Sequence, residues 1–197
     1  MTTTAEGDAE EIGSAGEDRA LMARVQGGDE GAFATLMERW ERPVKSVIAR
    51  IVLNASEAEE LAQETFVRVW QRRESFRAGA EFRPWVFAVA VNLARNRLRW
   101  WRRRPSVSLQ DWTETIGDGE RGRGGVGEGM ERDEQAGAVR EAIAALPVEL
   151  REAIVLFEYE QMSHIEIGVT VGATPKAVET RIHRAREKLR VALKRWV

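Results

Sequence analysis

The sequence predicts an all-α protein of two small helical domains joined by a flexible linker, the second domain a helix-turn-helix. Apolar residues recur at a spacing of three and four over most of the chain, which is typical of helices with one buried face. No segment alternates apolar and polar residues between turn signals, as a strand would. Residues 1–17 and 105–137 are acidic and poor in large apolar side chains, so we expect a disordered tail and a flexible linker there. The predicted domains therefore span residues 18–104 and 138–197.

Composition excludes several classes of protein. The 197 residues include no Cys and two His, which argues against a disulfide framework, a thiol nucleophile or a zinc site. No apolar run approaches ~18 residues and no basic leader precedes an apolar segment, so we expect no membrane insertion and a cytoplasmic location. The glycine-rich phosphate loop, the serine nucleophile elbow and the zinc-protease motif are also missing from the sequence. We therefore expect neither catalysis nor a cofactor.

The net charge of −2 hides an uneven distribution of charge along the chain. Six arginines and no acid lie within residues 92–104, and eight bases against two acids lie within residues 175–197. Acids gather in the predicted tail and linker instead. A single basic block is often only a solvated helix face. Two blocks in one small chain suit a nucleic-acid partner, because Lys and Arg neutralise phosphates.

The predicted helices of the first domain follow from caps and apolar spacing. A short helix over residues 21–26 ends at a pair of glycines. Asp29 caps the next helix, in which Pro43 predicts a kink or a break. A capping box beginning at Ser56 opens a third helix. After a loop, Pro84 at a first helical position opens a long helix that ends near residue 103.

The second domain begins with two helices between residues 139 and 158, again by apolar spacing. A capping box beginning at Ser163 opens a short helix, which Gly172 ends. Thr174 caps a long helix with Pro175 at its first position. A short helix, a turn containing glycine and a longer basic helix make up the helix-turn-helix layout.

The terminal helix has two faces. Apolar residues form a stripe that suits a core, and Lys176, Thr180, Arg181 and Arg184 lie broadly on the other side. A major groove of DNA admits one helix. Polar and basic side chains near the N-terminus of that helix can therefore contact the edges of the DNA bases, while Lys and Arg further along the helix contact phosphates. The alternative is an amphipathic helix with a solvated face.

The long helix of the first domain ends in arginines interleaved with Trp100 and Trp101. Basic groups beside aromatic rings suit unpaired bases, which stack on the rings while Arg contacts phosphates. Phe76 and Phe82 precede this helix or lie near its start, and an amide such as Asn92 can pair with a base edge. Alternatives stay open for each: core packing for Phe82, a structural amide for Asn92, and docking on a protein for the Trp pair.

Taken together, these segments resemble a known family. Residues 56–70 (SEAEELAQETFVRVW) are similar to the region 2 helix that binds the polymerase clamp in extracytoplasmic-function (ECF) sigma factors, a branch of the sigma-70 family. Residues 76–99 (FRAGAEFRPWVFAVAVNLARNRLR) resemble the following segment of region 2. Residues 145–189 (ALPVELREAIVLFEYEQMSHIEIGVTVGATPKAVETRIHRAREKL) resemble region 4. The motifs also follow the order of the family.

The resemblance implies a promoter-specificity subunit that binds core RNA polymerase and promoter DNA, helps to melt the DNA, and is held inactive by an anti-sigma factor. Residues 18–104 would be region 2, which binds core polymerase and the −10 element, and residues 138–197 would be region 4, which binds the −35 element. A flipped non-template base would enter a pocket near Phe76, Phe82 and Asn92.

The matched site residues fall into three groups. They are Glu60, Gln63, Glu64 and Arg68 for core polymerase; Phe76, Phe82, Asn92, Arg95 and Arg99 for the −10 element and melting; and Arg151, Pro175, Lys176, Thr180, Arg181 and Arg184 for the −35 element.

The chain departs from the family pattern at some positions, and two other functions stay open. Asn96 replaces an Asp, and Glu179 replaces a Lys in the terminal helix, where an acid favours the amino group of cytosine over a phosphate. A stand-alone helix-turn-helix regulator, whose first domain senses a signal or dimerises, is the main alternative. A nuclease is the other, although its carboxylate or His metal cluster is missing.

Overall fold

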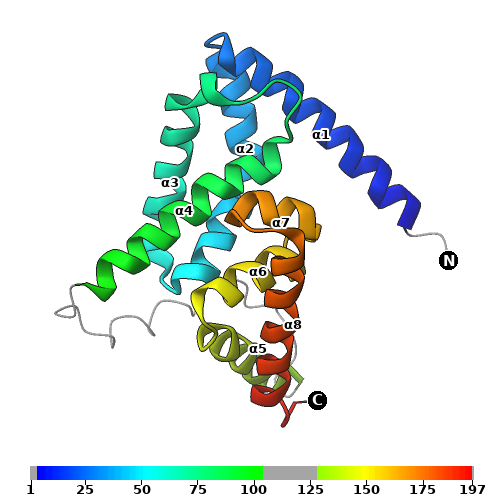
Figure 1. The fold of residues 1–197 in the computed structure, drawn as a ribbon, viewed down its shortest axis with the longest axis vertical. Coiled ribbons are helices and arrows are strands. Elements are labelled where there is room, and N and C mark those ends of the chain that lie inside the picture. The colour runs from blue at the N-terminus through cyan, green and yellow to red at the C-terminus, as the bar shows by residue number, and fades with distance from the viewer. Residues whose placement is uncertain (1–3, 104–127, 197) are drawn as a thin grey trace.

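The computed structural model describes residues 4–103 and 128–196, with side chains from 15 to 103 and from 134 to 196 (Figure 1). These described residues form helices and contain no strand, which confirms the all-α prediction. In chain order the elements are α1 (Thr4–Gln26), α2 (Glu30–Val52), α3 (Ala55–Gln71), the 3-10 helix η1 (Arg73–Ser75), α4 (Phe82–Arg102), α5 (Glu128–Ala144), α6 (Val148–Glu158), α7 (His164–Val171) and α8 (Pro175–Ala192).

α1 extends into residues 1–17, the stretch predicted to be a disordered tail. The helix begins at Thr4, and the first three residues lie outside the described part of the chain. Its C-terminal half is anchored, because the buried Asp18 side chain accepts hydrogen bonds from Trp40 Nε1 at 2.9 Å and from Arg39. A helix fixed by packing propagates at little cost into a Pro-free segment, and acids near its N-terminus favour it further.

α5 overlaps the end of the linker predicted over residues 105–137. The helix begins at Glu128, so the last ten residues of that stretch are helical. The residues just before the second domain are mostly good helix formers, and they lead into Ile143 and Leu146, which are buried in the core. The rest of the predicted linker, through residue 127, lies outside the described residues.

Capping side chains fix the first residues of α2 and α3. Asp29 accepts a hydrogen bond from the Ala32 N–H at 2.9 Å, which confirms the predicted cap. α3 begins two residues early, because Asn54, and not the predicted Ser56, accepts from the Glu57 N–H at 2.9 Å. Asn is as favourable as Ser at this position, and the earlier cap lengthens the helix.

Two prolines lie inside helices of the first domain. α2 is continuous through Pro43, so there is no break. Proline removes one hydrogen bond, and buried residues on either side, among them Trp40 and Val47, hold the helix together by packing. α4 begins at Phe82, which makes Pro84 its third residue. That position is tolerated, because the first four N–H groups of a helix need no intrahelical partner.

The first domain, α1 to α4, is built around an aromatic core. Trp40 of α2 packs edge-on against Phe82 and Phe87 of α4, with ring centroids 6.0 and 5.8 Å apart. Phe76, from the loop before α4, packs on Trp85 at 5.1 Å. The loop is therefore fixed to the helix that follows it.

The second domain contains the predicted helix-turn-helix in α7 and α8. α7 begins with the predicted capping box, in which Ser163 and Glu166 exchange hydrogen bonds. It ends at Gly172, whose φ of 69° is a left-handed conformation that favours glycine. Thr174 caps α8 and Pro175 is its first residue, as predicted.

Gly168 allows the turn between α7 and α8 to close. A Cβ atom at this position would lie 2.7 Å from the carbonyl oxygen of Ala173. The same carbonyl belongs to the residue whose N–H donates to the Gly168 oxygen at 2.9 Å, so neither backbone segment is free to move away. The glycine costs ~1 kcal/mol of helix propensity against alanine, and the close turn requires it.

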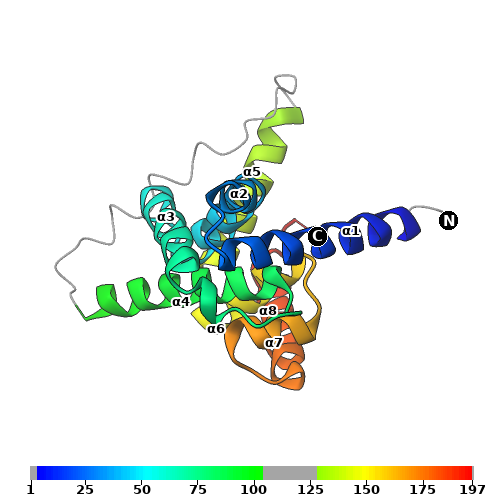
Figure 2. The same cartoon turned by 90° about the horizontal axis from the view of Figure 1, so that it is seen from above.

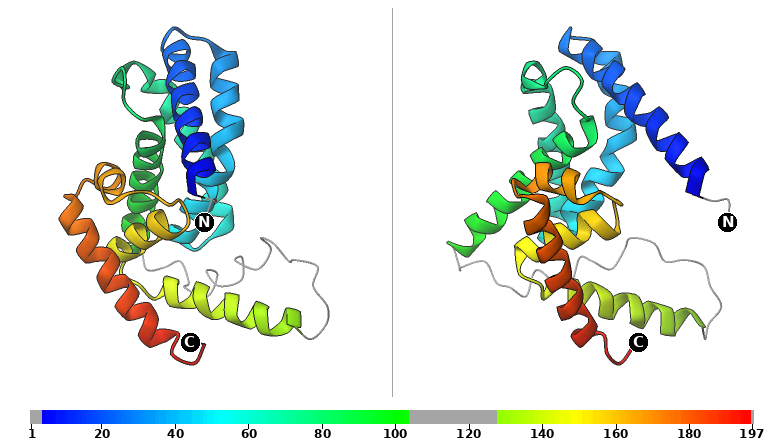
Figure 3. Two further views of the ribbon diagram at one scale, coloured as in Figure 1. Left: turned by 90° about the vertical axis from the view of Figure 1, so that its right-hand side faces the viewer. Right: turned by 45° about the vertical axis from the view of Figure 1, so that its right-hand side comes forward.

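The second domain packs directly on the first, with α7 against α4 and α6 against α2 (Figures 1 and 3). Residues of both domains share one hydrophobic core. At the interface Thr170 donates to the Pro84 carbonyl at 3.3 Å, and the Arg50 guanidinium lies 4.1 Å from the ring centre of Tyr159. α1 and α5 project from this body (Figure 2). The two domains are therefore docked to each other.

Candidate nucleic-acid interface

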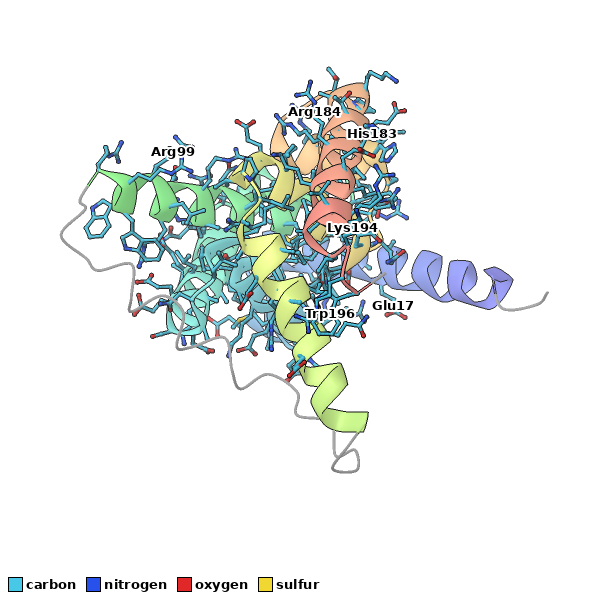
Figure 4. All side chains as sticks on the ribbon, turned by 90° about the horizontal axis from the view of Figure 1, so that it is seen from below. Glu17, Arg99, His183, Arg184, Lys194 and Trp196 are labelled. Carbon is cyan, nitrogen blue, oxygen red and sulfur yellow. The ribbon has the colours of Figure 1, made fainter. Side chains whose placement is uncertain are left out.

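α8 presents a line of polar and basic side chains to solvent, opposite the face that packs on α6. Lys176, Thr180 and Arg184 are exposed and follow one another at intervals of four residues, beginning one residue after the exposed Pro175. Figure 4 shows Arg184 pointing outward from α8. A major groove admits a helix with this arrangement, which places the first turns nearest the bases.

Glu179 lies beside this line and pairs with Lys176 at 2.8 Å. That hydrogen bond lowers the pKa of Glu179, so the carboxylate is ionised at neutral pH. Its side chain is 53% exposed. An exposed carboxylate among basic side chains repels phosphates, but it can accept a hydrogen bond from the exocyclic amino group of a DNA base.

Arg181 lies beside the line formed by Lys176, Thr180 and Arg184 and is half-buried. It borders a cavity of about 350 Å³ between the second domain and α4. Three further arginines line this cavity from α4, namely Arg95, Arg99 and Arg102. The structure therefore brings together residues that the sequence predicts for the −10 element and for the −35 element. Arg99 and Arg184 lie on one side of the molecule (Figure 4).

Arg151 is buried, with 6% of its surface exposed, although the resemblance predicts a contact with the −35 element. Its guanidinium donates to the carbonyls of Ile51 at 2.7 Å, Leu146 at 3.0 Å and Ala144. Burial, and then the neighbouring Arg102, lower the pKa of Arg151 to about 10, so it stays protonated at neutral pH. In this arrangement the side chain holds α6 against α2 and does not reach the surface.

Arg95 is also engaged between the domains. It donates two hydrogen bonds, at 2.6 and 3.0 Å, to the carboxylate of Glu152, which is wholly buried. A third contact joins its Nη1 to Asn92 Oδ1 at 3.5 Å. Arginine uses the same two-pronged geometry for carboxylates and for phosphates, so Glu152 occupies the donors that a DNA phosphate would take.

Phe76 and Phe82 lie in the core and not beside an open base pocket. Their ring centroids are 6.3 Å apart, both pack on Trp85, and neither is more than 5% exposed. Asn92 is exposed, but it follows Phe82 by ten residues along α4, or about 15 Å at the helical rise. The structure brings the two phenylalanines together and leaves Asn92 apart, so a base reaches the rings only if this cluster rearranges.

The outer face of α3 carries the side chains predicted to contact core polymerase. Glu60 and Gln63 are exposed, and Glu64 pairs with Arg68 at 2.6 Å. Val67 lies among them with 54% of its surface exposed, and the sequence analysis missed it. The sequence shows Val67 as an apolar residue outside the apolar stripe of this helix, and this position could have revealed it. A polar face with an apolar centre is typical of protein interfaces.

The described side chains contain no group of three His, Asp or Glu that could hold a metal ion. None of the helices in the described part of the chain is long and apolar enough to cross a membrane.

Comparison with known proteins decides the family. Residues 36–104 match the family model described as Sigma-70 region 2, and residues 136–189 match Sigma-70, region 4. The chain is 34% identical over 181 residues to the RNA polymerase sigma-H factor of Pseudomonas aeruginosa, covering 90% of this chain and 94% of that protein. It is 33% identical over 176 residues to the ECF RNA polymerase sigma-E factor of Escherichia coli K12, covering 87% and 92%. The chain belongs to the extracytoplasmic-function branch of the sigma-70 family.

This family assignment confirms the resemblance found in the sequence. The ECF sigma factor is a non-enzymatic initiation factor that binds promoter elements through regions 2 and 4. The match to region 2 runs from α2 to the end of α4, and the match to region 4 runs from α5 into α8. The solved structure of CnrH in complex with the cytosolic domain of CnrY is similar, with a TM-score of 0.69 and 28% identity over 90% of this chain and 97% of that chain.

Proposed function

We propose that this sigma factor contacts core RNA polymerase through α3, the −10 element through α4 and the −35 element through α8, and that α4 takes part in melting the promoter. The observation that carries this assignment is the presence of two basic helices, one in each domain. α8 exposes nearly all of its bases, and α4 exposes Arg99 and Arg102 near its end. Domain boundaries at residues 18–104 and 138–197 fit the proposal, with most of α1 and the start of α5 as extensions.

On α8, we assign Lys176, Thr180 and Arg184 to the DNA, because they form one exposed line from the first turn of the helix. Pro175 sets the direction of that turn. Arg181 would join them after the domains separate, since it now borders the cavity beside α4. While Arg151 is buried, it would not contact the DNA but would hold α6 against α2.

On α4, we assign Asn92, Arg95 and Arg99 to the −10 element, with Phe76 and Phe82 as candidates for base stacking after rearrangement. Unpaired bases stack on aromatic rings, and arginines neutralise their phosphates. On α3, Glu60, Gln63, Glu64 and Arg68 would contact core polymerase, with Val67 between them.

Promoter binding requires the two domains to separate in this proposal. Arg95 is held by Glu152, and Arg151 is held by backbone carbonyls at the interface. Both are polar contacts made by single side chains, so contacts with polymerase could take their place. The docked arrangement would be the form of the free protein.

An anti-sigma factor is a further expected partner. One solved structure that is similar over 90% of this chain pairs CnrH with the cytosolic domain of CnrY. A partner of that kind would bind this chain in its docked arrangement. A cytoplasmic location agrees with this proposal, because the polymerase and the promoter lie there.

Reconstitution with core RNA polymerase tests the proposed function. The full chain should co-elute with core enzyme in a one-to-one complex and direct transcription from a subset of a random promoter library. A chain that binds duplex DNA alone, without associating with core enzyme, would instead be a stand-alone helix-turn-helix regulator. A single substitution on α3, Val67→Asp, should prevent co-elution while leaving the unfolding midpoint unchanged, because Val67 is exposed.

Arg181→Ala should weaken recognition of the −35 element by the holoenzyme by ~1–3 kcal/mol if the side chain contacts a base. The measurement is equilibrium binding to promoter fragments with the selected and with a scrambled −35 sequence. An equal loss on both fragments would show that Arg181 contacts only phosphate.

A further inference from the structure

The cavity between α4 and the second domain has an unusual lining. Its volume is about 350 Å³, and four of its lining residues are arginines: Arg95, Arg99 and Arg102 from α4 and Arg181 from α8. Glu149, at the start of α6, is the one carboxylate among the described residues that line it. Cations from two domains therefore converge on one small space.

These charges are poorly compensated. Arg95 is neutralised by Glu152. Arg99, Arg102 and Arg181 make no hydrogen bond or ion pair with any residue that the structure describes. The single carboxylate of Glu149 leaves an excess of positive charge in the cavity.

This excess opposes domain docking. Arg99 and Arg102 are exposed and Arg181 is half-buried, so solvent screens part of their mutual repulsion, and the remainder acts against docking. Arg102 acts in this way on the buried Arg151, whose pKa is lowered to about 10 by burial first and by Arg102 next. An anion in the cavity would reverse the sign of the interaction, because each guanidinium would then gain a partner.

We propose that this cavity binds a small polyphosphate anion and that the bound anion holds the two domains together. The forked donors of arginine match phosphate oxygens in pairs, and several arginines on one cavity suit an anion with more than one phosphate group. A volume near 350 Å³ lies at the lower end of the range for small-molecule sites, which fits an inorganic polyphosphate or the phosphate chain of a nucleotide.

The consequence for transcription rests on the function proposed above. Arg95, Arg99 and Arg181 are assigned there to promoter DNA, and the anion would occupy the same donors. A polyphosphate would therefore favour the docked form and compete with the promoter. Arg102 lines the cavity but is not among the residues assigned to DNA or polymerase. A substitution of Arg102 therefore tests anion binding separately from promoter binding.

Tripolyphosphate is the probe for the binding step. Calorimetric titration of the full chain at constant ionic strength, without divalent cations, should give saturable binding at one site. Arg102→Ala should raise the dissociation constant about tenfold or more, because a charged hydrogen bond is lost. Lys188→Ala is the matched control: it removes one exposed charge from α8, outside the cavity, and should leave the constant within twofold.

Domain closure is measured by energy transfer between two labels. The chain has no Cys, so Gln71→Cys in the first domain and Lys194→Cys after α8 give one label site on each side. Tripolyphosphate should increase transfer in this double variant, and Arg102→Ala should remove the increase. A matching readout is the binding of holoenzyme to promoter DNA, which tripolyphosphate should inhibit less when Arg102 is replaced.

Three results would overturn the proposal: no saturable binding of tripolyphosphate, equal weakening by Arg102→Ala and Lys188→Ala, or binding without any change in energy transfer. A loss of promoter binding in Arg102→Ala, with no binding of tripolyphosphate, would make the cavity part of the nucleic-acid interface instead. Transcription by the wild-type holoenzyme without polyphosphate is measured separately, so failure of the proposed function is distinguished from failure of the anion site.

Discussion

Arginine has two roles in this chain, and its surroundings decide between them. The five donors of a guanidinium suit phosphates, carboxylates and backbone carbonyls alike. Arg184 is exposed on α8 and accessible to DNA. The guanidinium of Arg95 is instead bound to Glu152, and that of Arg151 to three backbone carbonyls. The residue type therefore predicts an anion or carbonyl partner, and burial selects which one it is.

Glu179→Gln should change which promoters are selected. The ionised Glu179 carboxylate can accept a hydrogen bond from the amino group of cytosine, so the wild-type holoenzyme should prefer cytosine at one position of the −35 element by ~1–3 kcal/mol. Selection from a library randomised at that element measures the preference. Glu187→Gln is the control on the same helix, where Glu187 pairs with Arg190. Identical selected sequences for wild type and Glu179→Gln would contradict the prediction.

Gly168→Ala should destabilise the second domain by ~1–3 kcal/mol, because the added methyl group would meet the Ala173 carbonyl at 2.7 Å. Chemical denaturation of the full chain, followed by circular dichroism, measures the loss. Gly137→Ala on α5 is the control: nothing lies within 4 Å of its Cβ position, so it should be neutral or stabilising. A neutral result for Gly168→Ala would mean that the turn relaxes.

At the scale of single elements, capping and packing share the work of defining a helix. α7 has only eight residues, which is too short for a stable helix on its own, so its capping box and its contacts with α4 and α8 hold it in place. Among the described residues of α1, Asp18 binds Trp40 and Arg39, and Met22 and Val25 are buried in the core. Short helices therefore depend on their ends, and long ones on any segment that is anchored.

Ser163→Ala should lower the stability of the second domain by ~1 kcal/mol, because it removes the side-chain acceptor of the Glu166 N–H. The free energy of unfolding by urea measures the effect. Ser56→Ala is the matched control. Ser56 lies inside α3 and Asn54 is the cap, so this change should stay within ~0.5 kcal/mol. Equal losses would indicate that Ser56 also caps α3.

At the scale of the whole molecule, the docking of the two domains decides which surfaces are available. The interface has an apolar centre shared with both cores and a polar set of ties, including the Arg95–Glu152 pair and the Arg151 hydrogen bonds. Interfaces of this mixed kind allow domains to move relative to each other. In the proposed function, DNA recognition and domain docking would therefore compete for the same arginines.

Glu152→Gln should shift the free chain toward the open arrangement. It weakens two hydrogen bonds to a charged partner, which are worth ~1.5–3 kcal/mol each, and leaves Arg95 without a counterion. Small-angle scattering should then give a larger radius of gyration, and the label pair at positions 71 and 194 should show less energy transfer. Glu158→Gln is the control, because its pair with Arg186 is exposed and lies within the second domain. An unchanged radius would show that apolar packing alone holds the domains.

Much of the fold could be predicted, because its signals are local. The caps Asp29 and Thr174, the capping box at Ser163 and the turn at Gly172 act within a few residues, and each is confirmed. The start of α3 was wrong because Asn54 and Ser56 are equally good caps. Helices α1 and α5 reach into the predicted tail and linker, because composition does not show where an anchored helix begins to propagate.

The sequence alone determined the helical class, the helix-turn-helix and the membership of the ECF sigma factors, since periodicity, caps and motif order are written in neighbouring residues. The tertiary structure alone decided the state of the predicted site. Arg95 meets Glu152 across 57 residues, and Arg151 meets Ile51 across 100. Contacts over such separations depend on how the domains dock, which is a matter of shape and buried area that no local pattern encodes. For the same reason the arginine-lined cavity exists only in the folded molecule.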